Sequence, residues 1–397
     1  MFESFPTAGL GHIASRMCGG DAARRVLTAR DFAMARAEIA GWEGYVPTPM
    51  VRFPELARRL GVSAVIYKDE GPRFGLGSFK ALGGAYAAQR LLQREISSRT
   101  GRDVTLSDIR AGKYATECAG MKLVAATDGN HGRALAWGCR RFGASCRIYI
   151  HAGVSEGRAA AIRDFGADVI RISGDYDASV ALARQEAAKN GWFVVSDTSW
   201  SGYSRPPRDV MSGYGVMAQE ICDALDEAPT HMFLQGGVGG FAAGVIAALR
   251  QHWGDRAPRP IIVEPALAAC LFESARTGEA TSVAIARETV MAGLSCGEPS
   301  PLAWEILAEE ASDFLTIPDS VVAPAVRLLA KPFPGDPMVE AGESAVAGLA
   351  ALIVARQDPD FSEKLGLDGC SRVLLIGTEG VTDRAVFDRM MGERDGD

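Results

Sequence analysis

The chain has 397 residues, of which 47% are hydrophobic and 23% are charged, and its formal net charge is −7. This composition is typical of a globular protein with a large core, and the length allows two domains. The negative charge argues against nucleic acid as a main partner. Because the chain shows neither an apolar run long enough to span a membrane nor an export-type N-terminus, we predict a cytoplasmic protein without membrane attachment.

The cysteines do not indicate a metal site. Eight cysteines are scattered along the chain, and none forms a Cys-x-x-Cys pair or groups with the five histidines at metal-binding spacing. We therefore expect buried thiols in a reducing compartment and no bound metal. A meeting of Cys270 and Cys296 in space remains open.

Strands and helices alternate along most of the chain. A charged, Ala-rich run over 28–42 predicts a covering helix, and the polar stretch 97–121 is interpreted as a surface insertion or connector. The predicted strands are 63–68, 123–127, 146–151, 168–172, 193–196, 231–234, 260–264 and 373–376, and the predicted helices between them are 78–95, 131–142, 155–165, 176–190, 209–225, 240–252 and 266–276. Such alternation predicts βαβ units and a mostly parallel sheet.

A lysine stands at the start of one of these helices. Lys80 follows an acidic, glycine-rich loop at 69–77 and lies in the first turn of a helix for which Ser78 is a suitable N-cap. The positive end of a helix dipole favours the neutral, nucleophilic form of an amine. Lysines used in this way form Schiff bases with carbonyl substrates or with pyridoxal phosphate. On this segment alone, an ordinary surface lysine is the alternative.

A glycine-rich loop joins another predicted strand to its helix. Glycine fills four of the five positions in 236–240, directly before the helix 240–252. Backbone N–H groups in such a loop can converge on a phosphate at a helix N-terminus. The loop lacks the Gly-Lys-Ser/Thr of a P-loop, and it does not form Gly-x-Gly-x-x-Gly. The alternative is a turn required only for close helix packing.

Polar side chains follow three more strands. Asp128 and Asn130 come after strand 123–127, Asp197 follows strand 193–196, and Thr378 with Glu379 follows strand 373–376. The alternative for Asp128 is a helix cap, with a turn at Asn130, and the alternative for the segment that contains Asp197 is a solvated loop. Thr378 with Glu379 is a very weak signal when taken alone. Because ligands of parallel α/β sheets gather at the carboxyl ends of strands, we predict that these side chains and Lys80 share one crevice.

These motifs resemble a known family. Ser78-Phe79-Lys80, Asp128-Gly129-Asn130-His131-Gly132 and the loop 236–240 occur in the order found in the fold type II pyridoxal-phosphate enzymes, the tryptophan synthase β-subunit superfamily. Threonine and serine dehydratases of this superfamily carry a serine-type residue where this chain has Asp128. A closer resemblance, to the diaminopropionate ammonia-lyases, covers roughly 40–390 and is carried by the segments 73–76, 127–133, 197–203, 291–299 and 377–380.

The resemblance implies a fold and an assembly. It implies an α/β protein of two three-layer domains with mostly parallel sheets and the cofactor in the cleft between them. The large domain would comprise 1–121 and 201–397, and a small α/β domain would be inserted at 122–200. Dimerisation as a homodimer is the family expectation.

The resemblance also implies how the chain holds pyridoxal phosphate. Lys80 would bind the cofactor covalently, with Phe79 beside it, and Asn130 would contact the cofactor's phenolic oxygen. Thr378 would face the pyridine nitrogen, while Glu379 has no assigned role. The phosphate would be bound by the backbone amides of Gly236, Gly237, Val238, Gly239 and Gly240.

The reaction implied is α,β-elimination of 2,3-diaminopropionate to pyruvate and ammonia, a carbon–nitrogen lyase activity of amino-acid catabolism. The substrate's β-ammonium group needs an acidic partner, and Asp128 and Asp197 are the available carboxylates. Lys80 is the natural base for the Cα proton. Asp128 on the opposite face would serve the other enantiomer, so both L and D substrates are expected.

Two other functions compete with this one. A serine, threonine or 3-hydroxyaspartate dehydratase, or a β-replacement enzyme, would use the same fold and lysine, and the leaving group distinguishes them. A non-catalytic protein that binds the cofactor or an amino acid is the alternative from another class. Cofactor binding without turnover of any amino acid would indicate it.

Overall fold

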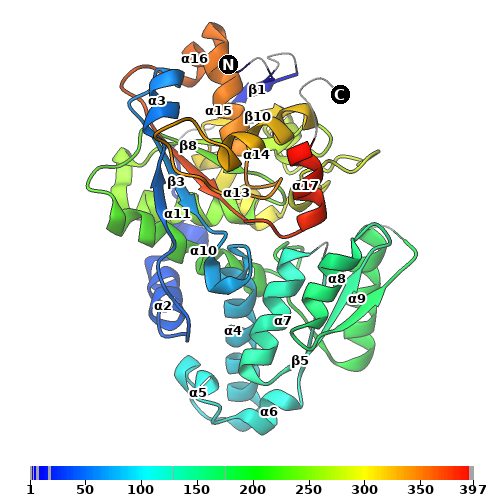
Figure 1. Cartoon of the computed structure of the whole chain (residues 1–397). Coiled ribbons are helices and arrows are strands. Elements are labelled where there is room, and N and C mark those ends of the chain that lie inside the picture. Colours follow the sequence, from blue (N-terminus) through cyan, green and yellow to red (C-terminus); the bar gives the residue numbers. More distant parts are fainter. Residues whose placement is uncertain are drawn as a thin grey trace. The chain divides into compact units, whose positions relative to one another are not determined.

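The computed structural model describes residues 2, 4–5, 9–16, 19–127, 129–174 and 176–392, with the side chain of Asp177 excepted. The chain forms two compact units, each built on its own sheet (Figure 1). The first unit comprises 1–29, 47–78 and 217–397, and the second comprises 30–46 and 79–216. All four strands of the second unit's sheet fall within 122–200, and the unit extends beyond that segment on both sides.

The first unit contains a seven-stranded sheet with five parallel inner strands and an antiparallel strand at each edge. The order is β1 (Gly11–Ala14), β10 (Asp313–Ile317), β9 (Arg259–Pro265), β8 (His231–Gln235), β11 (Arg372–Gly377), β3 (Ala64–Asp69) and β2 (Met50–Arg52). The inner strands read as continuous apolar runs because helices cover both faces. In β11 the side chains from Val373 to Ile376 are all buried.

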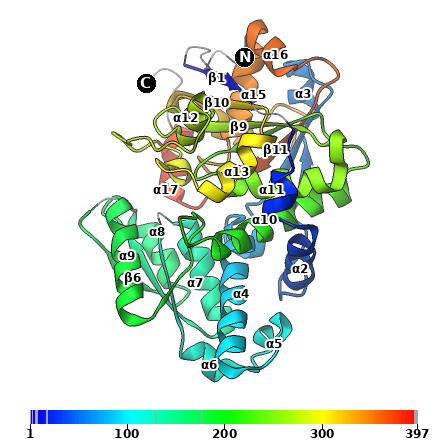
Figure 2. The same ribbon diagram turned by 180° about the vertical axis from the view of Figure 1, so that it is seen from behind.

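Helices cover both faces of this sheet. On one face α15 (Ala347–Gln357) packs across β8, β9 and β10, and nine consecutive residues, 347–355, are buried. On the other face lie α11 (Gly240–Trp253), α1 (Ala22–Val26) and α13 (Pro301–Glu310), as Figures 1 and 2 show. The remaining helices of this unit are α3 (Pro54–Leu60), α12 (Cys270–Thr277), α14 (Val322–Ala330), α16 (Pro359–Leu365) and α17 (Arg384–Gly392), with short 3-10 turns at Arg73–Gly75, Gly254–Arg256, Ala292–Leu294 and Asp319–Val321.

The second unit contains a four-stranded parallel sheet in the order β6 (Asp168–Arg171), β5 (Ser145–Ile150), β4 (Lys122–Ala126) and β7 (Phe193–Val194). The chain steps from β4 to β6 in one direction and returns to β7. Since parallel crossovers are right-handed, α9 lies on the face opposite α7 and α8. The longer helices of this unit are α4 (Lys80–Thr100), α7 (Asn130–Phe142), α8 (Glu156–Arg163), α9 (Tyr176–Asn190) and most of α2 (Ala29–Ile39) and α10 (Arg205–Ala224), and two short helices, α5 (Leu106–Arg110) and α6 (Ala115–Ala119), follow α4.

Glycines allow α7 and α10 to approach α4 closely. A Cβ built at Gly138 of α7 would lie 2.7 Å from the Cα of Ala85 in α4. A Cβ built at Gly213 of α10 would lie 2.0 Å from the backbone oxygen of Leu82. Any larger residue would have to push the helices apart. The two contacts therefore fix the N-terminal half of α4, whose first residue is Lys80.

The variant Gly138→Val tests this close packing. We expect it to lower the free energy of unfolding by about 1–3 kcal/mol, as other overpacked sites do, because the contact is with backbone atoms that cannot rotate away. Urea denaturation followed by circular dichroism measures the effect. The matched control is Gly157→Val in α8, where the built Cβ meets only Ser155 Oγ at 3.9 Å. Equal stability of the two variants would contradict the packing argument.

The stretch 97–121, interpreted as a surface insertion or connector, joins α4 to β4 and contains two short helices. Helix α4 continues to Thr100, and α5 (Leu106–Arg110) and α6 (Ala115–Ala119) follow. A capping box between Thr105 and Asp108 starts α5. The segment is held by hydrogen bonds from glutamines of α4, such as Gln89 Nε2 to the Leu106 oxygen at 2.9 Å. Hydrophobic periodicity does not detect such polar anchoring.

Within the described ranges, none of the helices is both long enough and apolar enough to cross a membrane.

Candidate active site

The structure brings together Lys80 and Asp197, two residues 117 positions apart. Lys80 Nζ donates a hydrogen bond to Asp197 Oδ2 at 2.7 Å, and the two side chains are only 21% and 15% exposed. The ammonium also lies 5.4 Å from the ring centroid of Phe79, whose ring packs on Tyr214 with centroids 4.7 Å apart. The lysine is thus held by a carboxylate on a largely aromatic surface.

Burial and charge act in opposite directions on Asp197. Burial alone would raise the pKa of this carboxyl, but the Lys80 charge, His131 and the hydrogen bond from Lys80 hold it well below its ordinary value. Burial raises the pKa of the neighbouring Tyr214 phenol, although the charge of Lys80 opposes that shift. Asp197 is therefore an anion, and Tyr214 is a neutral hydroxyl, at physiological pH.

The Asp197–Lys80 pair should contribute a pH-dependent part of the stability. Because the pKa of Asp197 is lowered on folding, its contribution is present above the unfolded pKa of about 3.9 and is lost as the pH falls further. At neutral pH we expect Asp197→Asn to cost about 1–3 kcal/mol of unfolding free energy in cofactor-stripped protein, less than a fully buried pair would. Urea denaturation of both proteins between pH 7 and pH 3 measures the difference. If the difference in unfolding free energy between the two proteins grew as the pH fell, the result would contradict the ion pair.

The start of α4 differs from its prediction. The helix begins at Lys80 with Phe79 as its N-cap residue, and no side chain caps it. The prediction that Ser78 caps the helix was wrong, because Ser78 forms an isolated antiparallel bridge with Glu379. The backbone before Lys80 is therefore fixed by the segment after β11 rather than by the helix itself.

The remaining candidate side chains of the second unit follow β4, which pairs in parallel with its neighbour β7. His131 lies in the first turn of α7, and its Nε2 donates to the Val195 oxygen at 2.8 Å. That bond leaves Nδ1, which has no hydrogen-bond partner within the described residues, 3.9 Å from Asp197 Oδ2. Asn130 is the first residue of α7 and is partly exposed. Asp128 lies outside the described residues.

The glycine loop lies between β8 and the 14-residue helix α11 of the first unit. Gly237 and Gly239 have φ of +63° and +91°, which other residues rarely adopt. A Cβ at Gly236 would lie 2.5 Å from Cγ of the buried Glu264, so glycine is required there as well. The first N–H groups of a helix have no partners within it and can bind an anion.

Cysteines line the back of this loop. Cys270 Sγ lies 3.6 Å from the Gly237 oxygen, and Cys296 Sγ would lie 3.7 Å from a Cβ at Gly237. No disulfide joins Cys270 to Cys296 in the part of the chain that the structure describes.

Strand β11, between β8 and β3, ends beside the same edge of the sheet. Thr378 and Glu379 follow it directly and are 5% and 3% exposed. Glu379 Oε1 accepts a hydrogen bond from the Ser344 N–H at 3.1 Å. This bond and the bridge to Ser78 give Glu379 a structural role in joining three segments. The parallel strands β8, β11 and β3 thus place the glycine loop, Thr378 and the loop before Lys80 at one edge.

A buried charge network fixes the loop that follows β3. Arg73 donates to both oxygens of Glu70 and of Glu220, each at 2.8 Å. Lys68 Nζ donates to Glu220 Oε2 and to the Thr48 oxygen, both at 2.7 Å. Arg73 and Lys68 are each 1% exposed. Two cations and two carboxylates balance in this network, and Arg73 with Lys68 holds the pKa of Glu220 below its ordinary value despite burial.

The backbone beside this network is strained. Phe74 has φ of +52°, and among the described residues it is the one non-glycine residue with positive φ. Such a conformation costs of order 1–3 kcal/mol and persists where the surroundings impose it. The same loop is tied to the sheet by the Glu70 N–H to Gly377 oxygen bond and the Gly380 N–H to Gly77 oxygen bond, both 2.9 Å. The path from β3 to Lys80 is therefore rigidly defined.

Tyr214 and the network around Arg73 were not identified from the sequence. Tyr214 lies between two glycines inside a predicted helix. Glycines within a helix indicate close packing, so this pair could have pointed to Tyr214. Arg73 and Glu220 are 147 residues apart, and no local pattern predicts that they meet.

A family model described as pyridoxal-phosphate dependent enzyme matches residues 42–379, and the chain belongs to this family. The predicted fold class and the predicted cofactor, pyridoxal phosphate, are confirmed by this membership.

Within the family, the chain is similar to diaminopropionate ammonia-lyases. It is 40% identical over 349 residues to that of Escherichia coli (strain K12), covering 86% of each chain, and 36% identical over 358 residues to that of Salmonella typhimurium, covering 87% of each. A crystal structure of the Escherichia coli enzyme in complex with an aminoacrylate-PLP azomethine reaction intermediate matches with a TM-score of 0.87, 35% identity and 96% of each chain covered. The predicted resemblance to this group is confirmed.

The residues present fit the cofactor. A largely buried lysine paired with a carboxylate can bind an aldehyde through Nζ. The glycine loop at the start of α11, where a Cβ at Gly236 would clash, suits a phosphate. The buried hydroxyl of Thr378 lies at the end of a neighbouring strand.

Proposed function

We propose that this protein is a carbon–nitrogen lyase that eliminates ammonia from 2,3-diaminopropionate, forming pyruvate. The observation that carries the proposal is the 2.7 Å hydrogen bond between Lys80 and Asp197, which puts a base and an anionic group for an amine side by side. The 40% identity to a diaminopropionate ammonia-lyase over 86% of each chain supports the substrate.

Lys80 would hold pyridoxal phosphate covalently, next to Phe79. Asn130 would bind its phenolic oxygen and Thr378 its pyridine nitrogen. The phosphate would be held by backbone amides of the glycine loop, Gly236, Gly237, Val238, Gly239 and Gly240. When bound, the cofactor supplies an electron sink for the charge that develops at Cα. A neutral hydroxyl such as that of Thr378, in place of a carboxylate, would leave the cofactor ring less electron-withdrawing, which favours elimination over transamination.

The protein's own groups move the protons. Lys80 Nζ would accept the Cα proton of the substrate. Asp197, whose pKa is lowered, stays anionic and binds the β-ammonium group. That contact keeps the β-nitrogen protonated, so it departs as ammonia with the electron pair of the Cβ–N bond. Water then releases the second nitrogen as ammonia, and pyruvate forms.

Asp128 would act on the opposite face of the substrate and remove the Cα proton of the D enantiomer. We expect Asp128→Asn to abolish turnover of D-2,3-diaminopropionate and to spare much of the L activity. Pyruvate release from each enantiomer measures the two activities separately. An equal fall in both would make Asp128 a general binding group instead.

The test of the proposed function is pyruvate release from the pyridoxal-phosphate-loaded protein. L- and D-2,3-diaminopropionate are compared with serine, threonine and 3-hydroxyaspartate, using lactate dehydrogenase to detect pyruvate and a dinitrophenylhydrazine assay to detect the 2-oxobutyrate and oxaloacetate that threonine and 3-hydroxyaspartate would give. Rapid release from the diamine supports the proposal. Turnover of a hydroxy amino acid with none of the diamine would overturn the substrate and the role of Asp197, while keeping Lys80.

We also propose that the protein works in the cytoplasm as a homodimer. Composition supports the location, and the family resemblance supports the dimer. Size-exclusion chromatography with light scattering tests the assembly, since a monomer has a mass of 42.1 kDa.

A further inference from the structure

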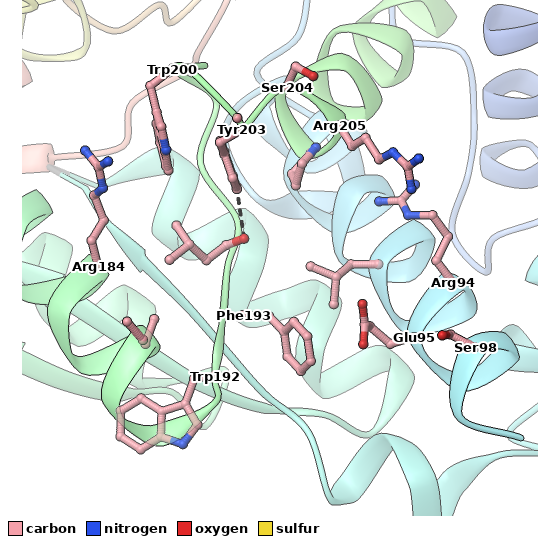
Figure 3. Close-up of a pocket in the computed structure, with 16 residues that line it drawn as sticks. Arg94, Glu95, Ser98, Arg184, Trp192, Phe193, Trp200, Tyr203, Ser204 and Arg205 are labelled. Carbon is pink, nitrogen blue, oxygen red and sulfur yellow. Dashed lines mark hydrogen bonds between the residues drawn. The ribbon is translucent and has the colours of Figure 1, made fainter.

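A pocket of about 690 Å³ lies wholly within the second unit, apart from the Lys80 site. Its walls come from α4, from α9 and from the segment 192–206 that connects β7 to the start of α10 (Figure 3). Leu91, Ala187 and Val194 make part of its lining apolar. The pocket is large enough for a small organic molecule.

The charges around this pocket are unequal. Arg94, Arg184 and Arg205 line it, against the single carboxylate of Glu95. This concentration of positive charge stands out in a chain with a net charge of −7. The pocket therefore favours anions over cations.

Two of the three arginines, Arg184 and Arg205, have no acidic partner among the described residues. Arg94 forms an ion pair with Asp209 at 2.7 Å, whereas no side-chain ion pair or hydrogen bond of Arg205 exists among the described residues. Figure 3 shows the guanidinium groups of Arg94 and Arg205 turned toward each other. Asp209 offsets the charge of Arg94, so the unbalanced positive charge at this end of the pocket is that of Arg205. Guanidinium forks fit phosphate and carboxylate groups with paired hydrogen bonds.

The opposite wall contains a stacked pair of aromatic rings and carries the third arginine. The rings of Trp200 and Tyr203 stack with centroids 3.8 Å apart and planes within 7°. Arg184 lies 4.2 Å from the Trp200 centroid. The Tyr203 hydroxyl donates to the Val194 oxygen at 2.9 Å, which locks the stack onto β7. The contact with the Trp200 ring therefore holds Arg184 at the pocket, and the N–H groups of Arg184 can bind a ligand.

We propose that this pocket binds a small organic anion with at least two negative charges, carried on phosphate or carboxylate groups. Arg94 and Arg205 bind one charged group, and Arg184 binds a second across the pocket. The hydroxyls of Ser98 and Ser204, which also line the pocket, donate further hydrogen bonds. The apolar lining contacts the carbon skeleton of the ligand.

Binding at this pocket would affect the Lys80 site through the chain. Asp197 lies three residues before Trp200, and the Ser196 N–H donates to the Tyr203 hydroxyl at 3.0 Å. An anion that fixes the segment 200–205 therefore also fixes the carboxylate that holds Lys80, and it lowers the KM for the amino-acid substrate. This second step rests on the proposed function, whereas the binding step does not.

Isothermal titration calorimetry of the pyridoxal-phosphate-loaded protein tests the binding step. Sodium pyrophosphate and sodium citrate are the two probes, in a buffer free of other multivalent anions. We expect saturable binding of at least one probe and a change in tryptophan fluorescence, because Trp192 and Trp200 line the pocket. Preference for pyrophosphate or citrate distinguishes a phosphate ligand from a carboxylate ligand.

The variant Arg205→Gln should weaken the preferred probe's binding by roughly tenfold or more, the usual worth of a hydrogen bond to a charged group. Arg184→Gln should weaken it comparably. The control is Arg102→Gln, at an exposed arginine of the same unit outside the pocket. Absence of binding by both probes, or unchanged affinity in Arg205→Gln, would overturn the proposal. Calorimetry does not depend on turnover, so its failure is separate from a failure of the pyruvate assay.

Discussion

Replacing Lys80 with alanine is expected to abolish covalent binding of pyridoxal phosphate and to lower turnover by about 10³-fold or more, since one positioned acid–base group contributes 10²–10⁴-fold. The protein should lose the visible absorbance of the lysine-bound cofactor, and borohydride should no longer fix the cofactor to the chain. Spectra before and after borohydride, together with pyruvate release, measure both effects. The geometric reason is that Lys80 is the amine held against Asp197 on an aromatic surface.

The control for this variant is Lys113→Ala. Lys113 pairs with Asp108 in the same unit, but its side chain is 66% exposed. It should keep the cofactor absorbance and the full activity. A borohydride-stable cofactor adduct that persists in Lys80→Ala would show that another amine carries the cofactor.

Removing Arg73 should cause the largest loss of stability. In Arg73→Leu, the carboxylates of Glu70 and Glu220 stay buried and lose their shared partner. Breaking a buried ion pair by removing one member costs about 3–5 kcal/mol, and we expect a loss of that order in the free energy of unfolding. Urea denaturation of the purified protein measures it. If the variant does not fold, Glu220→Gln, which keeps the shape of the side chain, should show a smaller loss in the same direction.

The matched control is Arg58→Leu. Arg58 also forms an ion pair with a glutamate, Glu55, but its side chain is 69% exposed. Solvent screens such a pair, so the free energy of unfolding should barely change. Equal effects in the two variants would mean that burial does not set the strength of the Arg73 network.

The alternation of strands and helices was predictable because the parallel strands are short apolar runs bounded by turns. The strand that precedes the glycine loop was predicted at 231–234, and the structure has it at His231–Gln235. The positions of Lys80 and Asp197 at strand exits were also predictable from the topology rule for α/β sheets. Their direct hydrogen bond joins two residues that both lie within the second unit.

Contacts that depend on distant partners were not predictable in the same way. The helix α15 is buried along its length, so it has no polar face and no helical periodicity to detect. Arg73 looks like a surface residue in the sequence, because a buried arginine is rare unless it is paired. Its partner Glu220 becomes a neighbour of Arg73 only in the folded chain.

The depth of the network around Arg73 has a consequence for salt tolerance. Dissolved ions screen charges that solvent reaches, and they have little effect on the charges of this network, which are 6% exposed or less. The strained backbone at Phe74 and the path to Lys80 therefore keep their geometry from dilute buffer to concentrated brine. The loop before Lys80 is thus held by charges that salt does not screen, whereas the Lys80–Asp197 pair, 21% and 15% exposed, is open to screening.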